Sequence, residues 1–316
     1  MSGLILAACG GPISELPKAP APAGSGISIK AEAVPLNPAD PKPDRVGNFI
    51  YAGGLNLTSA QTSRLHGLSD LDIQPDGSLT AVGDEGDLLR AKVGLDPENR
   101  LTAVTDAKLT ALTGLDGKPL QGKDNRDSEG LALLPNGDLL ISFERRDRIW
   151  LYPANGGPPH AVPSPNVTFP YNQGMEALAP DPMRGPDAYI TGGETTGQTW
   201  LCSLTTPCAD GPRVPLAMGF GLVAARRLPQ DRTAWLLRAF NPVTRSVIDL
   251  RITDQTGRVV DQLELRGPLT VDNFEGLAAV PNPDGGLRFY LISDDNFSSS
   301  QRTLLLAFDW KPPSRR

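Results

Sequence analysis

Residues Glu129–Glu144 read EGLALLPNGDLLISFE. An acidic residue and a glycine open this stretch, two apolar runs stand on either side of a Pro-Asn-Gly turn, and a second acidic residue closes it. Short apolar runs joined by an Asn-Gly turn predict a β-hairpin. A hairpin brings its first and last residues to the same end, so the two carboxyl groups are expected to face the same side of the molecule.

The same pattern recurs along the chain as an internal repeat. A second clear copy starts at Glu275, and weaker copies start at His66, Glu176 and Phe220. The five starting positions are 63, 47, 44 and 55 residues apart, close to the ~40–50-residue period of propeller blades. Further β-rich runs follow each copy and supply the additional strands that a four-stranded blade needs.

The last copy has a third strand near residues 303–310 and no fourth. Phe49–Leu55, near the N-terminus, can fill that place and remove an exposed sheet edge. We therefore predict an all-β protein, a β-propeller of five or six four-stranded blades over residues 46–312, with the ring closed by an N-terminal strand. The 33 Gly and 31 Pro residues in 316 exclude a helical bundle.

Residues 1–9 resemble a truncated bacterial lipoprotein signal, in which Leu6-Ala7-Ala8-Cys9 is the lipobox and Cys9 the lipidated residue. The usual length and basic region of a signal are missing, and a chance Ala-Ala-Cys is the alternative. Residues 10–45 are rich in Pro, Ala and Gly, which predicts a linker. The expected location is the periplasm or cell envelope, with attachment to the membrane through the lipid.

Cys202 and Cys208 are six residues apart, a spacing that can close a small loop as a disulfide. Such a bond persists in an oxidising compartment, which agrees with export. Two buried free thiols are the alternative.

The charge and the scarcity of His and Cys limit the chemistry. With 30 basic and 36 acidic residues the net charge is -6, which argues against nucleic acid as a partner. Two His and three Cys cannot form a three-His or four-Cys zinc site. A metal would be bound mostly by oxygen, which favours Ca²⁺ or Mg²⁺. The sequence contains no Gly-x-Ser-x-Gly nucleophile motif.

In a propeller, the residue that opens the first strand of a blade and the residue that closes its second strand lie at the same mouth of the central channel. The repeat places His66, Glu129, Glu176, Phe220 and Glu275 at the opening positions. The closing positions are Asp84 or Glu85, Glu144, Glu194, Arg238, and Asp294 or Asp295.

Such a ring of carboxylates needs neutralisation, because two unit charges ~4 Å apart cost about 4 kcal/mol at an effective dielectric constant of about 20. A hard cation with six to eight oxygen ligands is one solution. We predict a divalent metal, Ca²⁺ in the first place, and the predicted ligands are Glu129, Glu176, Glu275, Glu144 and Glu194. The alternative is that these acids pair with nearby arginines, namely Arg64, Arg126, Arg145 and Arg238.

Several motifs resemble one protein family. They are Asp127–Ala132 (DSEGLA), Ser142–Arg145 (SFER), Asn273–Ala278 (NFEGLA) and Leu291–Phe297 (LISDDNF). They look like the phytase-like family with esterase-like activity, over about residues 46–310. The resemblance implies an exported bacterial β-propeller classed with hydrolases.

A more distant likeness is to gluconolactonase-type propellers and calcium-dependent phytase propellers. In the gluconolactonase type a Glu-Gly motif holds a divalent ion on the axis, which implies such a role for Glu129 and Glu275. The sequence departs from that pattern at Phe220 and His66.

The predicted function is metal-assisted hydrolysis of a small-molecule ester or phosphoester. Asp294, Asp295 or His66 would accept a proton from water, while Arg126 and Arg145 would hold an anionic group. Phytate is not expected, because no large Lys/Arg cluster is present. A propeller that binds a ligand or protein without catalysis, or a lactonase, is the alternative. A monomer is expected.

Overall fold

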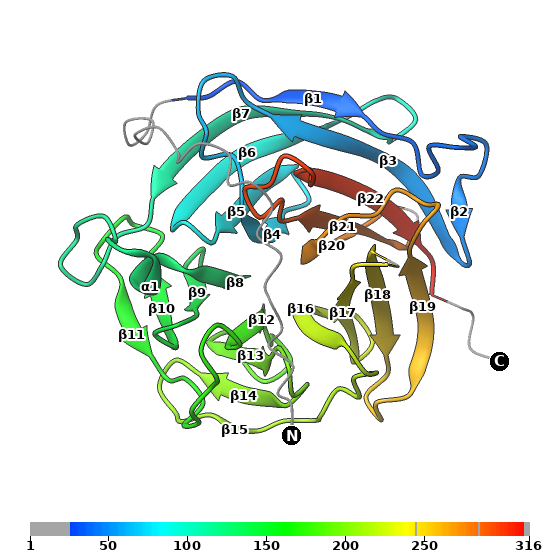
Figure 1. Ribbon diagram of the computed structural model, residues 1–316. Coiled ribbons are helices and arrows are strands. Elements are labelled where there is room, and N and C mark those ends of the chain that lie inside the picture. Colours follow the sequence, from blue (N-terminus) through cyan, green and yellow to red (C-terminus); the bar gives the residue numbers. More distant parts are fainter. Residues whose placement is uncertain (1–25, 244, 284, 313–316) are drawn as a thin grey trace, which may run out of the picture.

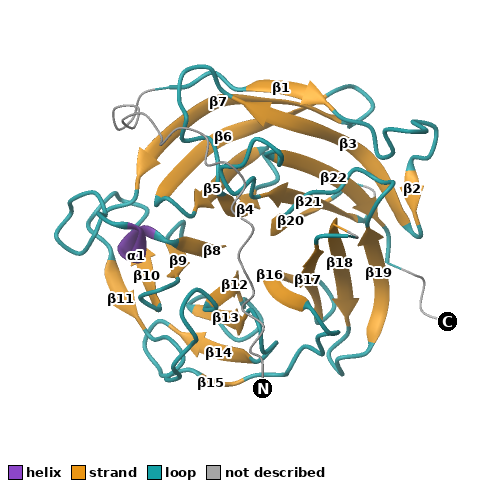
Figure 2. Ribbon diagram, in the orientation of Figure 1, coloured by secondary structure: helices purple, strands orange, loops and turns teal. Residues whose placement is uncertain are grey.

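The structure is a computed structural model that describes residues 26–312 apart from 244 and 284. Its sheets are arranged around a central axis as a β-propeller (Figure 1), with five blades. Strands make up nearly all the regular structure, and α1 (Lys123–Arg126) is the only helix in the described part of the chain (Figure 2). The predicted all-β propeller is confirmed. The predicted signal and lipidation site at Cys9 lie outside the described residues.

Four blades are antiparallel sheets of four strands, ordered from the axis outward. Blade 1 consists of β4 (Leu68–Ile73), β5 (Ser78–Gly83), β6 (Asp87–Leu95) and β7 (Leu101–Ala111). Blade 2 consists of β8 (Ser128–Leu133), β9 (Leu139–Phe143), β10 (Arg148–Tyr152) and β11 (His160–Val162). Blade 3 consists of β12 (Met175–Pro180), β13 (Ala188–Gly193), β14 (Thr199–Ser203) and β15 (Ala209–Asp210). Blade 4 consists of β16 (Phe220–Leu228), β17 (Arg232–Asn241), β18 (Arg245–Thr253) and β19 (Val259–Leu265).

Blade 5 joins the two ends of the chain. Its inner strands are β20 (Phe274–Pro281), β21 (Leu287–Ser293) and β22 (Leu304–Trp310). The fourth strand is β3 (Phe49–Thr58), which pairs antiparallel with β22 from Asn56 opposite Leu304 to Phe49 opposite Trp310. The predicted closure of the ring by an N-terminal strand is thus observed.

Within the described residues, the segment before β3 differs in part from the linker expected over residues 10–45. β1 (Lys30–Ala33) pairs with the outer edge of β3, β2 (Arg45–Val46) pairs with its start, and Leu36 is buried. The physical reason is that β3 is ten residues long and would otherwise present an unpaired edge. At least residues 30–33 therefore belong to the sheet.

The apolar faces of neighbouring blades pack against one another and form the core. The largest cluster lies between blades 4 and 5 and includes Phe49, Phe289 and Trp310, whose ring centroids are 6.1–6.2 Å apart. Within the described residues, no helix has the length and apolar character needed to cross a membrane. Cys202, on β14, forms a disulfide with Cys208.

Each innermost strand contains an irregularity near its start, where its register with the second strand shifts. The residues at these bulges are Ser69, Glu129, Glu176, Val223 and Glu275. A bulge bends the strand and re-aims a side chain. The equivalents of the three glutamates are therefore Ser69 and Val223, each three residues beyond the predicted positions His66 and Phe220.

One buried ion pair links all five innermost strands. Asp70, on β4, accepts hydrogen bonds from the backbone N–H groups of Leu131 on β8 (2.9 Å) and Leu277 on β20 (3.2 Å). Arg226, on β16, donates to both carboxylate oxygens of Asp70 at 3.1 Å and to the carbonyl oxygen of Leu178 on β12 at 3.0 Å. Asp70 is 0% exposed and Arg226 is 5% exposed. These two side chains therefore lie buried between the five innermost strands.

Candidate functional site

Two rings of side chains surround the mouth of the channel above the Asp70–Arg226 pair. The inner ring consists of the bulge residues Ser69, Glu129, Glu176, Val223 and Glu275. The outer ring consists of Asp84, Glu144, Glu194 and Asp294, which directly follow the second strands of their blades, and of Arg238, which lies within β17. Blade 4 contributes Val223 and Arg238 and is the only described blade without a carboxylate in either ring.

The Glu-Gly pairs in the inner strands have a steric cause. A Cβ atom on Gly130 would lie 2.4 Å from the carbonyl oxygen of Glu176 in the next blade, and one on Gly276 would lie 2.8 Å from the Cα of Asp70. Neighbouring inner strands therefore approach each other where each glutamate emerges. A larger residue after Glu129 or Glu275 would push the blades apart.

Two groups of carboxylates lie close enough together to hold a cation. Asp127, Glu129 and Glu144 offer oxygen atoms within 4.8 Å of one another, and so do Glu144, Glu176 and Glu194. Glu144 belongs to both groups. Its side chain is buried, and one oxygen accepts a 2.6 Å hydrogen bond from the backbone N–H of Gly174.

Burial of so many acids at the mouth raises their pKa values. Desolvation, followed by repulsion from neighbouring carboxylates, raises the pKa of Glu129 and that of Glu176 well above the ordinary value. Burial likewise raises the pKa of Glu144 to about 7 and that of Asp84 to about 7. Burial and the nearby Glu275 raise the pKa of Asp294 well above normal. The mouth is a place where negative charge is poorly tolerated unless a cation accompanies it.

The donor set fits a hard divalent cation. Glu176 Oε2 and Asp84 Oδ1 are buried and have no hydrogen-bond partner among the described residues. An unpartnered buried carboxylate oxygen is costly, and carboxylate oxygens are the ligands that Ca²⁺ and Mg²⁺ prefer.

Glu275, a predicted ligand, lies outside both carboxylate groups. One of its oxygens accepts hydrogen bonds from Arg238 and, at 2.9 Å, from Asn273. Arg238 also lies 3.2 Å from Glu194. A single guanidinium thus neutralises part of the mouth on the side of blades 3 to 5.

His66 and Asp295 form a hydrogen-bonded pair through Nδ1 of the imidazole. Asp295 is held in place by the backbone N–H groups of Gly67 and Phe297, each at 3.1 Å, and by the Thr303 hydroxyl at 2.9 Å. The hydrogen bond to Asp295 raises the pKa of His66, whose side chain is 41% exposed. This arrangement orients the imidazole and favours its protonated form.

The His66–Asp295 pair lies at the edge of the mouth. Gly67, the residue after His66, packs so closely on Asp84 that a Cβ there would be 2.2 Å from Asp84 Oδ1. The sequence repeat placed His66 in the inner ring, and the structure places it beside that ring instead.

The predicted anion-binding arginines are engaged with acidic side chains of the protein. Arg126 pairs with Glu85, and Arg145 pairs with Asp127 and donates to the Tyr171 hydroxyl at 2.7 Å. Arg64 likewise pairs with Asp87. All four arginines therefore pair with acids, but Arg238 alone among them pairs with predicted ligands, namely Glu194 and Glu275.

Sequence reasoning missed Lys123 as a residue of the mouth. Its ammonium group lies 2.7 Å from Asp84 and 2.6 Å from Asp127. Lys123 lies on α1, in the connection between blades 1 and 2, where no repeat pattern marks it.

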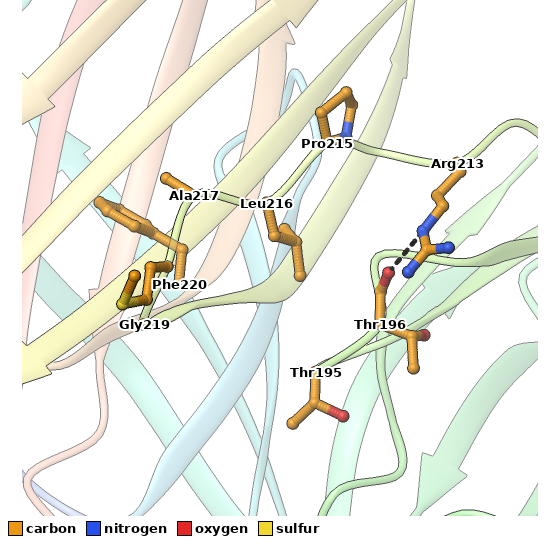
Figure 3. A pocket seen from close by; sticks show the side chains of 9 residues that line it. Thr195, Thr196, Arg213, Pro215, Leu216, Ala217, Gly219 and Phe220 are labelled. Atoms are coloured by element: carbon orange, nitrogen blue, oxygen red, sulfur yellow. Dashed lines mark hydrogen bonds between the residues drawn. The ribbon is translucent and has the colours of Figure 1, made fainter.

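A pocket of about 540 Å³ lies between the β13–β14 turn of blade 3 and the segment that leads into blade 4 (Figure 3). We call it the blade-4 groove. The groove is lined by Thr195, Thr196, Arg213, Pro215, Leu216, Ala217, Met218, Gly219 and Phe220. The lining begins with the residue directly after Glu194. No sequence motif marked this pocket.

The fold and the site define a five-bladed β-propeller with an acidic mouth above a buried Asp70–Arg226 pair. Residues 63–297 match the family described as phytase-like, with the esterase-like activity of phytase, and the chain belongs to that family. Among proteins with curated functions, none matches the sequence.

The structure is also similar to several solved structures at low sequence identity, among them the following three. A candidate gluconolactonase has 14% identity and a TM-score of 0.48, covering 89% of this chain and 92% of the other. A calcium-binding regucalcin from Agrobacterium tumefaciens has 14% identity and a TM-score of 0.46, covering 90% and 94%. Virginiamycin B lyase from Staphylococcus aureus, in an inactive variant bound to quinupristin, has 11% identity and a TM-score of 0.47, covering 90% and 100%.

Proposed function

We propose that this protein is a divalent-cation-dependent hydrolase of small, uncharged esters, and that the acidic mouth is its reaction centre. The observation that carries the proposal is the pair of carboxylate groups that share Glu144, together with the unpartnered buried oxygen of Glu176. Membership of a family described by esterase-like activity supports the reaction class.

The cation would be held by oxygens of Asp127, Glu129, Glu144, Glu176 and Glu194. When bound, it would supply a Lewis acid for the carbonyl oxygen of an ester. Asp127, Glu144 and Glu194 lie in loops, while Glu129 lies on β8 and Glu176 on β12. All five belong to blades 2 and 3, whose sheets form a rigid scaffold for them.

His66 is the proposed general base. Its Nε2 would take the proton of the attacking water, while Nδ1 stays on Asp295, whose carboxylate stabilises the imidazolium that results. Asp295 is a positioning residue in this scheme, because its oxygens are occupied by Gly67, Phe297 and Thr303 as well as by His66.

An uncharged ester suits the mouth better than a phosphoester. Seven carboxyl groups of the two rings face one ring arginine, Arg238, with Lys123 beside them. A phosphate group would meet this negative charge, and Arg126 and Arg145 are already paired with acids. We place phosphoesters second for this reason.

The test is an assay panel of 4-nitrophenyl acetate, 4-nitrophenyl phosphate and a simple lactone, each with CaCl₂ or with EDTA. We expect acetate turnover that EDTA abolishes and that falls at least ~100-fold in Glu129→Gln and Glu176→Gln. Glu98→Gln, at an exposed turn in blade 1, is the control.

Metal analysis of the same samples separates the outcomes. Tightly bound metal with no turnover of any substrate would replace this proposal with a non-catalytic binding propeller. Turnover that survives in both glutamine variants would place the reaction centre elsewhere.

We further propose that the protein is exported and anchored by a lipid on Cys9. The Leu6-Ala7-Ala8-Cys9 sequence supports this, and the Cys202–Cys208 disulfide is a bond typical of oxidising compartments. Palmitate labelling of the wild type and of Cys9→Ser, expressed in a bacterium, tests it. Equal labelling of both proteins, or none in either, would rule it out.

A further inference from the structure

The ammonium group of Lys123 occupies a cation position at the mouth, between blades 1 and 2. It lies 2.7 Å from the carbonyl oxygen of Asp84, 2.7 Å from Asp84 Oδ2 and 2.6 Å from Asp127 Oδ1. A lysine ammonium has three N–H donors, so each donor has one oxygen within hydrogen-bond distance. Glu85 Oε1 is a further oxygen at 3.7 Å. Carboxylate and backbone carbonyl oxygens are also the usual ligands of Ca²⁺.

One oxygen of this position is left without a donor. Asp84 Oδ1 is buried and has no hydrogen-bond partner among the described residues. Gly67 leaves room for this atom, since a Cβ on Gly67 would lie 2.2 Å from it. The ammonium has no further N–H to donate to Asp84 Oδ1, whereas Ca²⁺ takes about six to eight oxygen ligands and can bind both oxygens of one carboxylate. The position therefore offers one more ligand than a lysine can use.

The connection between blades 1 and 2 holds Lys123 in place. The backbone N–H of Asp127 donates to the carbonyl oxygen of Lys123 at 3.1 Å. Asn125, on the same short helix α1, accepts a hydrogen bond from Arg146 at its side-chain oxygen (2.9 Å) and one from Arg148 at its carbonyl oxygen. A group tethered beside its partners acts at a high effective concentration. A dissolved cation must therefore compete with the ammonium for these oxygens.

The charges are balanced on this side of the mouth and unbalanced on the other. Each of three acids near blade 1 has its own basic partner, in the pairs Asp84–Lys123, Glu85–Arg126 and Asp127–Arg145. Across the mouth, the carboxylate group of Glu144, Glu176 and Glu194 has Arg238 as its one ion-pair partner in the described part of the chain. A divalent ion is therefore stabilised most on the side of blades 2 and 3, where no lysine stands in for it.

We infer that Lys123 is a tethered cation that takes the place of a second divalent ion at the mouth, and that it thereby limits the protein to one bound Ca²⁺. The inference rests on the proposed function in one respect, since it takes the two carboxylate groups that share Glu144 as the site of that one ion. An uncharged side chain in place of Lys123 would free Asp84 and Asp127 to bind a second ion. Lys123 thus determines how many ions the mouth accepts.

The first experiment counts bound Ca²⁺ by calorimetric titration with CaCl₂, on protein that EDTA has freed of metal. We expect one ion per chain in the wild type and in Lys123→Arg, which keeps the positive charge, and two ions in Lys123→Met. The double variant Lys123→Met/Asp84→Asn should return to one ion, because it lacks one of the freed carboxylates. The matched control is Lys118→Met, because Lys118 is an exposed lysine of the same connection. This control should bind one ion.

The second measurement separates the loss of an ion pair from the gain of an ion site. Lys123→Met leaves two acids without this counter-charge, so its Tm in EDTA should fall, and CaCl₂ should raise its Tm more than that of the wild type. A lower Tm with an unchanged number of ions would show a structural lysine and overturn the inference. If Lys123→Met folds only with CaCl₂ present, metal analysis of protein purified in CaCl₂ gives the count. Failure to fold even then, while Lys118→Met folds, also overturns it.

The results for Lys123 and for the proposed function can be told apart. A wild type that binds no Ca²⁺, beside a Lys123→Met variant that binds one ion, supports the role of Lys123 and removes the cation of the proposed function. One ion in both proteins overturns the role of Lys123 and leaves the proposed function standing. Two ions in the wild type overturn the role of Lys123 as well.

Discussion

Glu144 is the residue on which the two carboxylate groups of the mouth depend, because it contributes to both. Its place follows from the hairpin of blade 2, in which β9 ends at Phe143 and leaves Glu144 at the mouth. The hydrogen bond from Gly174 fixes one of its oxygens and leaves the other for a ligand.

Replacing Glu144 by Gln should therefore weaken Ca²⁺ binding more than replacing Glu194, whose carboxylate belongs to one group and already pairs with Arg238. We expect a loss of at least ~10-fold in affinity for Glu144→Gln relative to Glu194→Gln. Calorimetric titration with CaCl₂ measures both. Equal losses would mean that the two groups do not act as one site.

The His66–Asp295 pair makes a prediction about pH. The base acts in its neutral form, and the hydrogen bond to Asp295 raises the pKa of His66. In Asp295→Asn that pKa falls, so the acidic limb of the kcat/KM profile should move to lower pH. His66→Asn should lose ~10²–10⁴-fold in kcat and show no such limb. An unchanged limb in Asp295→Asn would exclude His66 as the base.

At the scale of the element, the bulge in each innermost strand decides which side chain reaches the mouth. The sequence repeat located Glu129, Glu176 and Glu275 correctly in their strands, because the acid, the following small residue and the turn are local signals. It misplaced the equivalents in blades 1 and 4. A bulge adds a residue to one strand only. Blades 1 and 4 have no glutamate at the bulge, so the repeat alignment assigned His66 instead of Ser69 and Phe220 instead of Val223.

The close approach of the inner strands predicts the cost of enlarging the bulge glycines. Gly130→Ala and Gly276→Ala put a Cβ 2.4–2.8 Å from backbone atoms of the next blade. We expect each to lower the free energy of unfolding by about 1–3 kcal/mol in urea denaturation. Gly26→Ala is the matched control, because its Cβ would meet only Ala107 at 3.8 Å. An unchanged free energy of unfolding in Gly130→Ala would mean that the neighbouring blades move apart at no cost.

At the scale of the whole molecule, the excess of buried acids makes stability depend on pH and on cations. Asp84 and Glu144, each with a pKa raised to about 7, are joined by Glu129, Glu176 and Asp294 with pKa values well above normal. A carboxyl whose pKa is higher in the folded than in the unfolded state stabilises the fold below its unfolded pKa near 4, and this contribution is lost as the pH rises through the folded value.

Protein freed of metal with EDTA should therefore show a Tm that falls from pH 5 to pH 8. Calcium binds the ionised carboxylates, so CaCl₂ should raise Tm more at pH 8 than at pH 5. Differential scanning calorimetry at the two pH values checks both statements. A Tm of metal-free protein that rises toward pH 8 would contradict them.

The axial ion pair was the largest feature that the sequence did not reveal. Asp70 and Arg226 are charged residues inside apolar strands, which is a signal, but their pairing depends on ring closure that brings together residues 156 positions apart. The blades could be predicted because each is local in sequence. Contacts across the axis could not, because they depend on the number of blades and on the register of the bulges.

Breaking this pair should destabilise the whole ring. Asp70→Asn leaves the buried Arg226 without its counter-charge, and we expect a loss of about 3–5 kcal/mol in the free energy of unfolding. The double variant Asp70→Asn/Arg226→Met should recover part of that loss. Urea denaturation of the two variants tests it, and an equal or larger loss in the double variant would show that the packing of Arg226, rather than its charge, matters.

The Asp70–Arg226 pair also limits how molecules can enter and leave the central channel. Asp70 and Arg226 are 0% and 5% exposed, so the channel has little free space at their level. In the proposed function, substrate and products would therefore enter and leave by the same mouth. An alcohol or acid product that dissociates slowly would compete with the next substrate molecule. A long polymer could not pass through the channel and so could not be cleaved processively. The architecture suits small substrates that bind and dissociate quickly.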